Sequence, residues 1–215
     1  MKIYKLIVDT DNGFQAVLDI APKELLPKDI YKDYSKDFID CLILDLDKGK
    51  KITDVLNVGT LGLDGFPIKI KYYELLKKYN LLKIQFVDII DKDLKDYKFM
   101  FFNSNITDKL DYQKCDFYLV EDMLGDITEL DTKINPTRKG VIEADLEFCV
   151  EDIFAKLIPR NGYHFLPGFN INEYDVFRIG HFDLYYYVSE RVKTELENNN
   201  ITGVKFVEQP YFNME

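Results

Sequence analysis

The sequence predicts an α+β protein with a mixed, mostly antiparallel sheet, a few helices and a single compact unit. Many short segments are rich in branched and aromatic side chains, which is typical of strands, whereas few have the i, i+3, i+4 spacing of an amphipathic helix. The composition supports a packed core, because 47% of the 215 residues are hydrophobic and 31% are charged. The chain is therefore expected to fold around strands, with helices packed against them.

The first 60 residues are expected to form a β-rich part. Two turns, Asn12-Gly13 and the segment 47–50, are each flanked by alternating apolar and polar residues, a pattern that is typical of β-hairpins. The first hairpin would pair residues 2–8 with 14–20, and the second would pair 40–46 with 51–56.

Residues 61–215 are expected to form a second, α+β part, or else residues 1–215 form one continuous domain. Three glycines and one proline within 59–67 predict a loop. Apolar residues at helical spacing then predict a helix over 70–79. Strands are expected to follow at 83–90, 97–102, 116–120 and 126–130.

The segment 141–148 alternates in polarity and predicts a half-buried strand, with Glu143, Asp145 and Glu147 on its polar face. A helix that starts near Asp145 competes with this strand, because the apolar residues from 146 to 157 also follow a helical stripe. We favour a strand up to residue 148 and a helix over 150–157.

The last 40 residues show sharper signals. Strands are expected at 175–179 and 184–188, and Ser189 is a favourable N-cap for a helix that ends in the three asparagines 198–200. After Gly203, a final strand is expected over 204–207.

The charge is strongly uneven along the chain. The formal net charge is −10, and the segment 116–152 alone holds 11 acidic and three basic residues. Such a chain is a poor ligand for nucleic acid, whose phosphates require a basic face. The asymmetry instead favours a basic partner.

The sequence offers no catalytic, metal or cofactor motif. The three cysteines have no CxxC spacing and lie beside apolar residues, so free thiols in a reducing compartment are expected. No apolar run approaches the length of a membrane span, and the N-terminal run is too short for a signal peptide. We therefore expect a cytoplasmic protein with no metal, no cofactor, no membrane and no nucleic acid as partners.

Three motifs in the C-terminal block resemble a known pattern: Phe177-Arg178-Ile179, Val188-Ser189-Glu190 with Leu196, and Ile201-Thr202-Gly203-Val204-Lys205-Phe206. They are similar to a family of bacterial immunity proteins from polymorphic-toxin systems, immunity protein family eleven, formerly a domain of unknown function. The resemblance reaches back to about residue 62 and leaves the first 60 residues outside it. It implies a fold signature and carries no active site.

The resemblance implies a non-enzymatic antitoxin that binds a cognate toxin domain. The alternative is a carboxylate-based hydrolase that acts on a sugar or a nucleotide. The uneven charge makes the acids of 116–152 the candidates for partner binding, and exposed tyrosines of the strand 184–188 would add interface anchors. The candidate partner-binding residues are Asp116, Glu121, Asp122, Asp126, Glu129, Asp131, Glu143, Asp145, Glu147, Tyr185 and Tyr187.

Overall fold

A computed structural model gives the fold, and it describes residues 2–20, 41–59, 64–91, 93–102, 106–123, 126–149, 152, 154–180, 182–209 and 212–213. Strands in mostly antiparallel sheets predominate over helices, which confirms the α+β class. The chain groups into two compact units, of which the first contains residues 1–105, 172–178 and 185–208 and the second contains residues 106–171, 179–184 and 209–215. The first unit thus includes residues on both sides of the boundary that we expected near residue 60.

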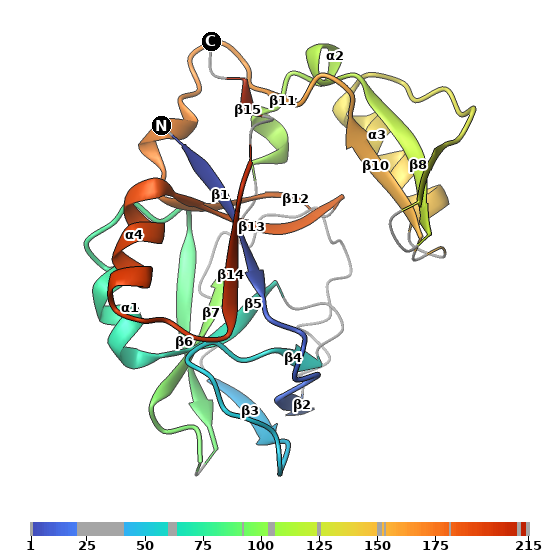
Figure 1. The fold of residues 1–215 in the computed structure, drawn as a ribbon. Helices are drawn as coiled ribbons and strands as arrows, with labels where there is room; N and C mark the ends of the chain where they lie inside the picture. Colours follow the sequence, from blue (N-terminus) through green and yellow to red (C-terminus); the bar gives the residue numbers. More distant parts are fainter. Residues whose placement is uncertain are drawn as a thin grey trace. The chain divides into compact units, whose positions relative to one another are not determined.

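The first sheet has the strand order β12-β13-β1-β14 (Figure 1). Its strand β1 (Ile3–Val8) lies between β13 (Asp183–Ser189) and β14 (Val204–Glu208) and pairs antiparallel with both. The strand β12 (Val176–Gly180) forms one edge and β14 forms the other. The first strand of the chain is therefore held by two of the last.

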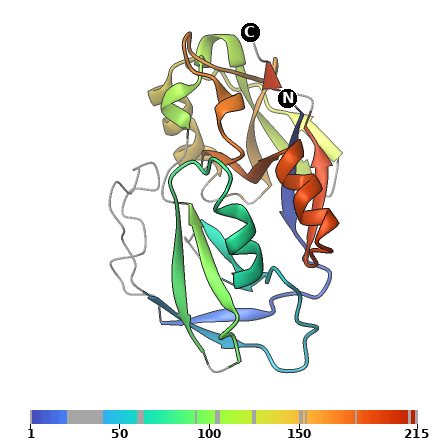
Figure 2. The same ribbon diagram turned by 90° about the vertical axis from the view of Figure 1, so that its left-hand side faces the viewer.

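A second sheet of the first unit has six strands in the order β4-β2-β3-β6-β7-β5. Figure 2 shows the long antiparallel pair of β6 and β7 in green, in front of the helix α1. The strands are β2 (Ala16–Ile20), β3 (Cys41–Leu46), β4 (Val58–Gly59), β5 (Gly65–Lys69), β6 (Ile84–Ile90) and β7 (Tyr97–Phe102).

The described part of the first unit also contains two α-helices. The helix α1 (Ile70–Leu76) buries Tyr72 and Leu76, and α4 (Glu190–Asn198) buries Val192 and Leu196. These side chains share one apolar core with residues of β1, β5 and β7. Burial of a large apolar side chain stabilises a fold by about 1.5–3 kcal/mol, so this core holds the two ends of the chain together.

The second unit contains a three-stranded sheet with the order β10-β8-β9. Its strands are β8 (Phe117–Met123), β9 (Asp126–Glu129) and β10 (Ala155–Pro159). The helix α3 (Arg138–Ala144) runs on into a π-helical turn η3 (Asp145–Cys149) and lies beside β8 and β10 (Figure 1). The remaining short elements of the chain are η2 (Thr107–Lys109), α2 (Tyr112–Cys115), β11 (Tyr163–His164), η4 (Ile171–Glu173) and β15 (Phe212–Asn213).

Most local predictions are confirmed. The helix predicted over 70–79 is α1, although it ends three residues earlier, and the predicted strands at 83–90, 97–102, 116–120 and 126–130 are β6 to β9. The C-terminal order of strand, strand, helix and strand is also confirmed as β12, β13, α4 and β14.

Both predicted N-terminal hairpins are wrong, although their turns exist. The amide of Gly13 donates to the carbonyl of Thr10 at 2.8 Å and Gly49 has φ +89°. However, β1 pairs with β13 and β14, whereas β2 pairs with β3 and β4. Residues 51–56 form no strand, because Val55 and Leu56 donate their amides to the C-terminal turn and to β5. The strand β1 and residues 51–56 therefore pair with segments that are much farther away in sequence than the predicted hairpin partners.

The strand predicted over 141–148 and the helix predicted over 150–157 are wrong as well. Residues 138–144 form α3, which Thr137 caps by accepting a hydrogen bond from the amide of Gly140 at 3.1 Å. Residues 155–159 are β10. The second half of the loop predicted at 59–67 is β5, an edge strand in which Pro67 needs no amide hydrogen, while residues 60–63 lie outside the described residues.

Ser189 caps α4 as predicted, since its Oγ accepts a hydrogen bond from the amide of Val192 at 3.4 Å. The same Oγ donates to Oδ1 of the fully buried Asp175 at 2.6 Å. We expect Ser189→Ala to lower the free energy of unfolding by about 2 kcal/mol, because the cap and a buried hydrogen bond are lost together. Chemical denaturation measures this loss, and Ser189→Thr, which keeps the hydroxyl, is the control. A loss below about 0.5 kcal/mol would contradict the capping role.

Candidate functional site

The acids predicted to bind a partner gather largely in the second unit, on and around its three-stranded sheet. Glu121 and Asp122 lie on β8, Asp126 and Glu129 lie on β9, and Asp116 and Asp131 flank these two strands. The second unit contains 15 acidic and seven basic residues, so it carries a net charge of −8 of the total −10. The charge excess of the chain thus belongs to one structural unit.

Three of these acids form ion pairs with bases that lie outside the segment 116–152. Asp122 pairs with Lys156 at 2.6 Å, and Glu129 accepts two hydrogen bonds from Arg160 at 2.6 and 3.2 Å. Arg160 also lies 3.3 Å from Asp116. Its hydrogen bonds lower the pKa of Glu129 below the ordinary value of a glutamate. These three positions are therefore partly neutralised on the surface.

Four other acids form no ion pair among the described residues. Asp126, Asp131 and Glu147 are exposed and Glu121 is half-buried. Within the described ranges, none of these four carboxylates has a lysine or arginine at ion-pair distance. They are the part of the predicted acidic surface that remains available to an external base.

The predicted row of Glu143, Asp145 and Glu147 on one strand face is wrong. The three residues lie on α3 and η3, where Asp145 is buried and only Glu143 and Glu147 are exposed. Glu143 is 3.5 Å from Lys139, one helical turn earlier. Helical geometry separates side chains that alternation had placed together, so Asp145 is not part of a surface that binds a partner.

The tyrosine prediction is half wrong. Tyr187 is fully buried and stacks on Phe177 with ring centroids 5.4 Å apart, so it belongs to the core. Tyr185 is 40% exposed, and the Nζ of Lys5 lies 3.9 Å above its ring. Only Tyr185 can contribute to an external contact.

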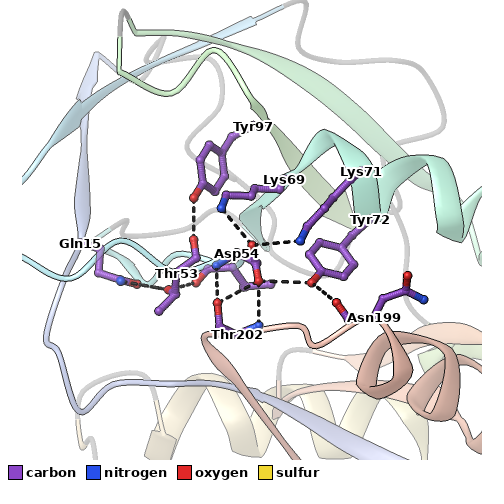
Figure 3. A network of polar contacts seen from close by, with 10 residues as sticks. Gln15, Thr53, Asp54, Lys69, Lys71, Tyr72, Tyr97, Asn199 and Thr202 are labelled. Atoms are coloured by element: carbon purple, nitrogen blue, oxygen red, sulfur yellow. Dashed lines mark hydrogen bonds and ion pairs between the residues drawn. The ribbon is translucent and has the colours of Figure 1, made fainter.

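A network of polar contacts around Asp54 lies in the first unit (Figure 3). The buried carboxylate accepts hydrogen bonds from both the amide and the hydroxyl of Thr202, at 3.0 and 2.9 Å. It forms an ion pair with Lys69 at 3.0 Å, and Lys71 lies 3.6 Å away. The hydroxyl of Tyr72 donates a bifurcated hydrogen bond to Asp54 Oδ2 at 3.2 Å and to the carbonyl oxygen of Asn199 at 3.0 Å.

This network fixes the carboxylate in its charged form. Burial alone would raise the pKa of Asp54, but the hydrogen bonds and charge of Lys69 and the contacts of Thr202 lower it below the ordinary value of an aspartate. The same turn contains Gly203 at φ +86°, where an added Cβ would lie 2.2 Å from the carbonyl oxygen of Val55. The segment 53–55 and the turn 199–203 are therefore locked together.

A second buried carboxylate, Asp175, forms hydrogen bonds with the N-cap and the first turn of α4. It accepts hydrogen bonds from Ser189 at 2.6 Å, from the amide of Asn80 at 3.0 Å and from Arg191 as a bidentate pair at 2.5 Å. Burial would raise the pKa of Asp175, but Arg191 and Ser189 lower it below its ordinary value. A third ion pair, in addition to those of Asp54 and Asp175, joins the buried Arg178 to Asp64.

The polar residues of the three C-terminal motifs thus have structural roles. Arg178, Ser189 and Thr202 each hold one carboxylate, and none of these carboxylates was singled out from the sequence. In the sequence, Asp54, Asp64 and Asp175 could not be distinguished from the other acids among the 38 Asp and Glu residues. No local pattern separates a buried aspartate from an exposed one. These three residues of the motifs therefore support the fold.

Within the described residues, no group of three or more His, Cys, Asp or Glu side chains is placed to hold a metal ion. Cys115 and Cys149 are free thiols, and burial raises their pKa values, to about 11 and about 12, so both remain protonated at neutral pH. The side chain of Cys41 lies outside the described residues. None of the helices that the structure describes has the length and apolar character required to cross a membrane.

No protein-family model matches the chain, and no curated protein matches it either.

Proposed function

We propose that this protein is a non-enzymatic immunity protein, which binds a cognate bacterial toxin domain through its acidic second unit and thereby neutralises the toxin. The observation that carries the proposal is the concentration of charge, since the second unit holds −8 of the net −10. The similarity of the C-terminal motifs to immunity proteins supports the same class. The encounter is expected in the cytoplasm, where free thiols such as Cys115 and Cys149 persist.

Charge also indicates which toxins fit best. An enzyme that cleaves nucleic acid needs a basic groove for phosphates, and an acidic protein can occupy that groove. Complementary charge mainly accelerates association and rejects wrong partners. A standard interface would bury about 800 Å² on each side, of which the exposed acids of the second unit would be a part.

The proposal predicts that a toxin domain is encoded beside this gene, and it is tested by co-expressing the chain with that domain. We expect the two proteins to co-purify as a stable complex and the chain to restore growth of cells that produce the toxin. A toxin variant without activity is the control for expression. If the purified proteins do not associate and growth is not restored, the chain is not an immunity protein for that toxin.

A charge-neutralised variant tests the role of the second unit. We expect Asp126→Asn, Asp131→Asn and Glu147→Gln, combined, to slow association with the toxin about tenfold at low ionic strength and to flatten its salt dependence. Stability should change little, because all three acids are exposed.

The matched control removes three exposed acids of the first unit, Asp45→Asn, Asp47→Asn and Asp93→Asn. Its net charge changes by the same amount, so any general effect of charge appears in both variants. Stopped-flow association rates at two salt concentrations measure the difference. Equal rates for the two variants would remove this surface from the interface.

A further inference from the structure

The strand β9 is an open edge of the sheet in the second unit. It pairs with β8 and with no other strand among the described residues. All four of its residues are exposed, and the side chain of Ile127 is 60% exposed. Natural edge strands are usually shielded by a basic side chain, a proline or a covering element, because an open edge can accept another strand.

The ladder shows which backbone groups of β9 face outward. The amide of Leu130 donates to the carbonyl of Leu119 at 3.0 Å, and the register pairs Thr128 with Glu121. Since inward and outward groups alternate along an antiparallel strand, the amides and carbonyls of Ile127 and Glu129 point away from β8. In the part of the chain that the structure describes, neither of these two amides has a hydrogen-bond acceptor.

The strand β14 is also an edge of its sheet, but its charges differ from those of β9. Its Lys205 pairs with Asp9 at 3.3 Å and with Asp11 at 2.9 Å, and its Glu208 pairs with Lys2 at 3.1 Å. Such charged pairs, and a lysine above all, discourage the addition of another strand. The strand β9 has no lysine or arginine of its own. Its Glu129 pairs with Arg160, but its Asp126 has no base at ion-pair distance among the described residues.

We propose that the free edge of β9 binds an extended, basic segment of a partner protein as an additional antiparallel strand. Ile127 and Glu129 would supply up to four backbone hydrogen bonds, and Ile127 would contact an apolar side chain of the added strand. Asp126 and Asp131, which lack an ion pair among the described residues, would attract its lysines or arginines.

The charges of β9 favour such a partner over a second copy of this chain. Two β9 strands placed edge to edge would bring Asp126 and Glu129 of one copy beside the same acids of the other, and neither strand carries a base. Like charges on neighbouring strands are destabilising, whereas opposite charges stabilise the pair. The proposal rests on the proposed function only in taking the toxin domain as the natural source of the basic segment.

The decisive test uses a synthetic peptide and does not require the toxin. The probe is the capped hexapeptide Lys-Thr-Thr-Thr-Val-Lys, whose lysines would face Asp126 and Asp131 and whose valine would face Ile127. We expect amide hydrogen exchange at Ile127 and Glu129, measured by NMR, to slow about tenfold when nine tenths of the protein is bound. High salt should reverse the effect.

Two control peptides isolate the two contributions. The first replaces both lysines with glutamate, and the second carries N-methyl groups on the two residues that would face Ile127 and Glu129. Neither should slow exchange. If the basic peptide leaves both amides unprotected at every concentration, or if the N-methylated peptide protects them equally, strand addition at β9 is wrong.

A variant extends the test to the toxin domain. Ile127→Pro removes an outward amide and leaves the β8 ladder intact, which an edge strand tolerates. We expect it to weaken toxin binding at least tenfold more than Ile127→Ala does, with unchanged thermal unfolding. A toxin that binds Ile127→Pro as tightly as Ile127→Ala would overturn the edge proposal and leave the proposed function standing. Dimers of the free protein in light scattering would instead favour a second copy as the occupant and also overturn it.

Discussion

Replacing Gly203 with alanine is expected to lower the free energy of unfolding by about 3 kcal/mol or more. Two costs add at this position. The residue has φ +86°, which an L side chain rarely adopts, and its added Cβ would lie 2.2 Å from the carbonyl oxygen of Val55 and 2.5 Å from Oγ1 of Thr53. The carbonyl belongs to the backbone and cannot swing aside, so the turn must open. Urea unfolding measures the loss.

Gly49→Ala is the matched control for this prediction. Gly49 has φ +89°, nearly the same as Gly203, but an added Cβ would meet no atom within 4 Å. It should therefore cost only the backbone strain, about 1–2 kcal/mol. The difference between the two variants isolates the clash with the segment 53–55. Equal losses would mean that the turn and this segment are not in contact in solution.

Asp54→Asn is expected to lower the free energy of unfolding by about 3 kcal/mol. The amide has the shape of the carboxylate but no charge for Lys69. Its NH₂ group would face donors in either orientation: those of Thr202 and Tyr72 in place of Oδ2, or the ammonium groups of Lys69 and Lys71 in place of Oδ1. The control is Asp88→Asn, an aspartate of the same unit whose ion pair with Lys98 is 2.6 Å long but whose side chain is 72% exposed. The control should change stability by less than about 1 kcal/mol.

The same carboxylate predicts a pH dependence. The pKa values of Asp54 and Asp175 are lower in the folded protein than the ordinary value, which is about 3.9 in an unfolded chain. Each therefore contributes stability that is fully present above that value and is lost as the pH falls through the folded pKa. Stability should decline below about pH 4, and Asp54→Asn should make the decline shallower. Unfolding curves from pH 7 to pH 2 in both proteins test this, and parallel curves would contradict it.

Features that depend on interactions between nearby residues could be predicted from the sequence, whereas features that depend on residues far apart in the chain could not. Strands, turns and the helix cap at Ser189 depend on neighbours a few residues away, and these were correct over most of the chain. Pairing depends on the whole fold. The turn at Gly13 forms as predicted, yet β1 is drawn to β13 and β14, because Tyr4 and Leu6 then join the core shared by α1 and α4.

The strand prediction for the segment 141–148 was wrong for a different reason. Its alternating apolar residues fit both a strand and a helix, and period alone does not decide between them for a short segment. The deciding contacts are the cap at Thr137 and the close approach of Gly140 to Asn135, where an added Cβ would lie 2.5 Å from the Asn135 carbonyl oxygen. Both lie before the segment whose pattern we analysed.

The candidate surface was predictable as a region and less so by residue. Composition located the acidic excess, and the second unit carries it. The sequence could not tell that Lys156 and Arg160 would reach three of the acids, that Asp145 would be buried, or that Tyr187 would stack on Phe177 while Tyr185 stays exposed. Each of these outcomes depends on residues that come together only in the folded chain.

The pairing of β1 between β13 and β14 also determines when the protein can finish folding during synthesis. The ribosome completes β1 first, but both of its partners emerge roughly 180–200 residues later, which takes about 10–40 seconds at ordinary rates of translation. Until then β1, with its residues Tyr4 and Leu6, lacks both of its neighbouring strands, and Asp54 lacks its hydrogen bonds from Thr202. A nascent chain of this protein therefore cannot complete its first unit until β14 has left the ribosome, and a product truncated directly after α4 would lack one of the two strands that pair with β1.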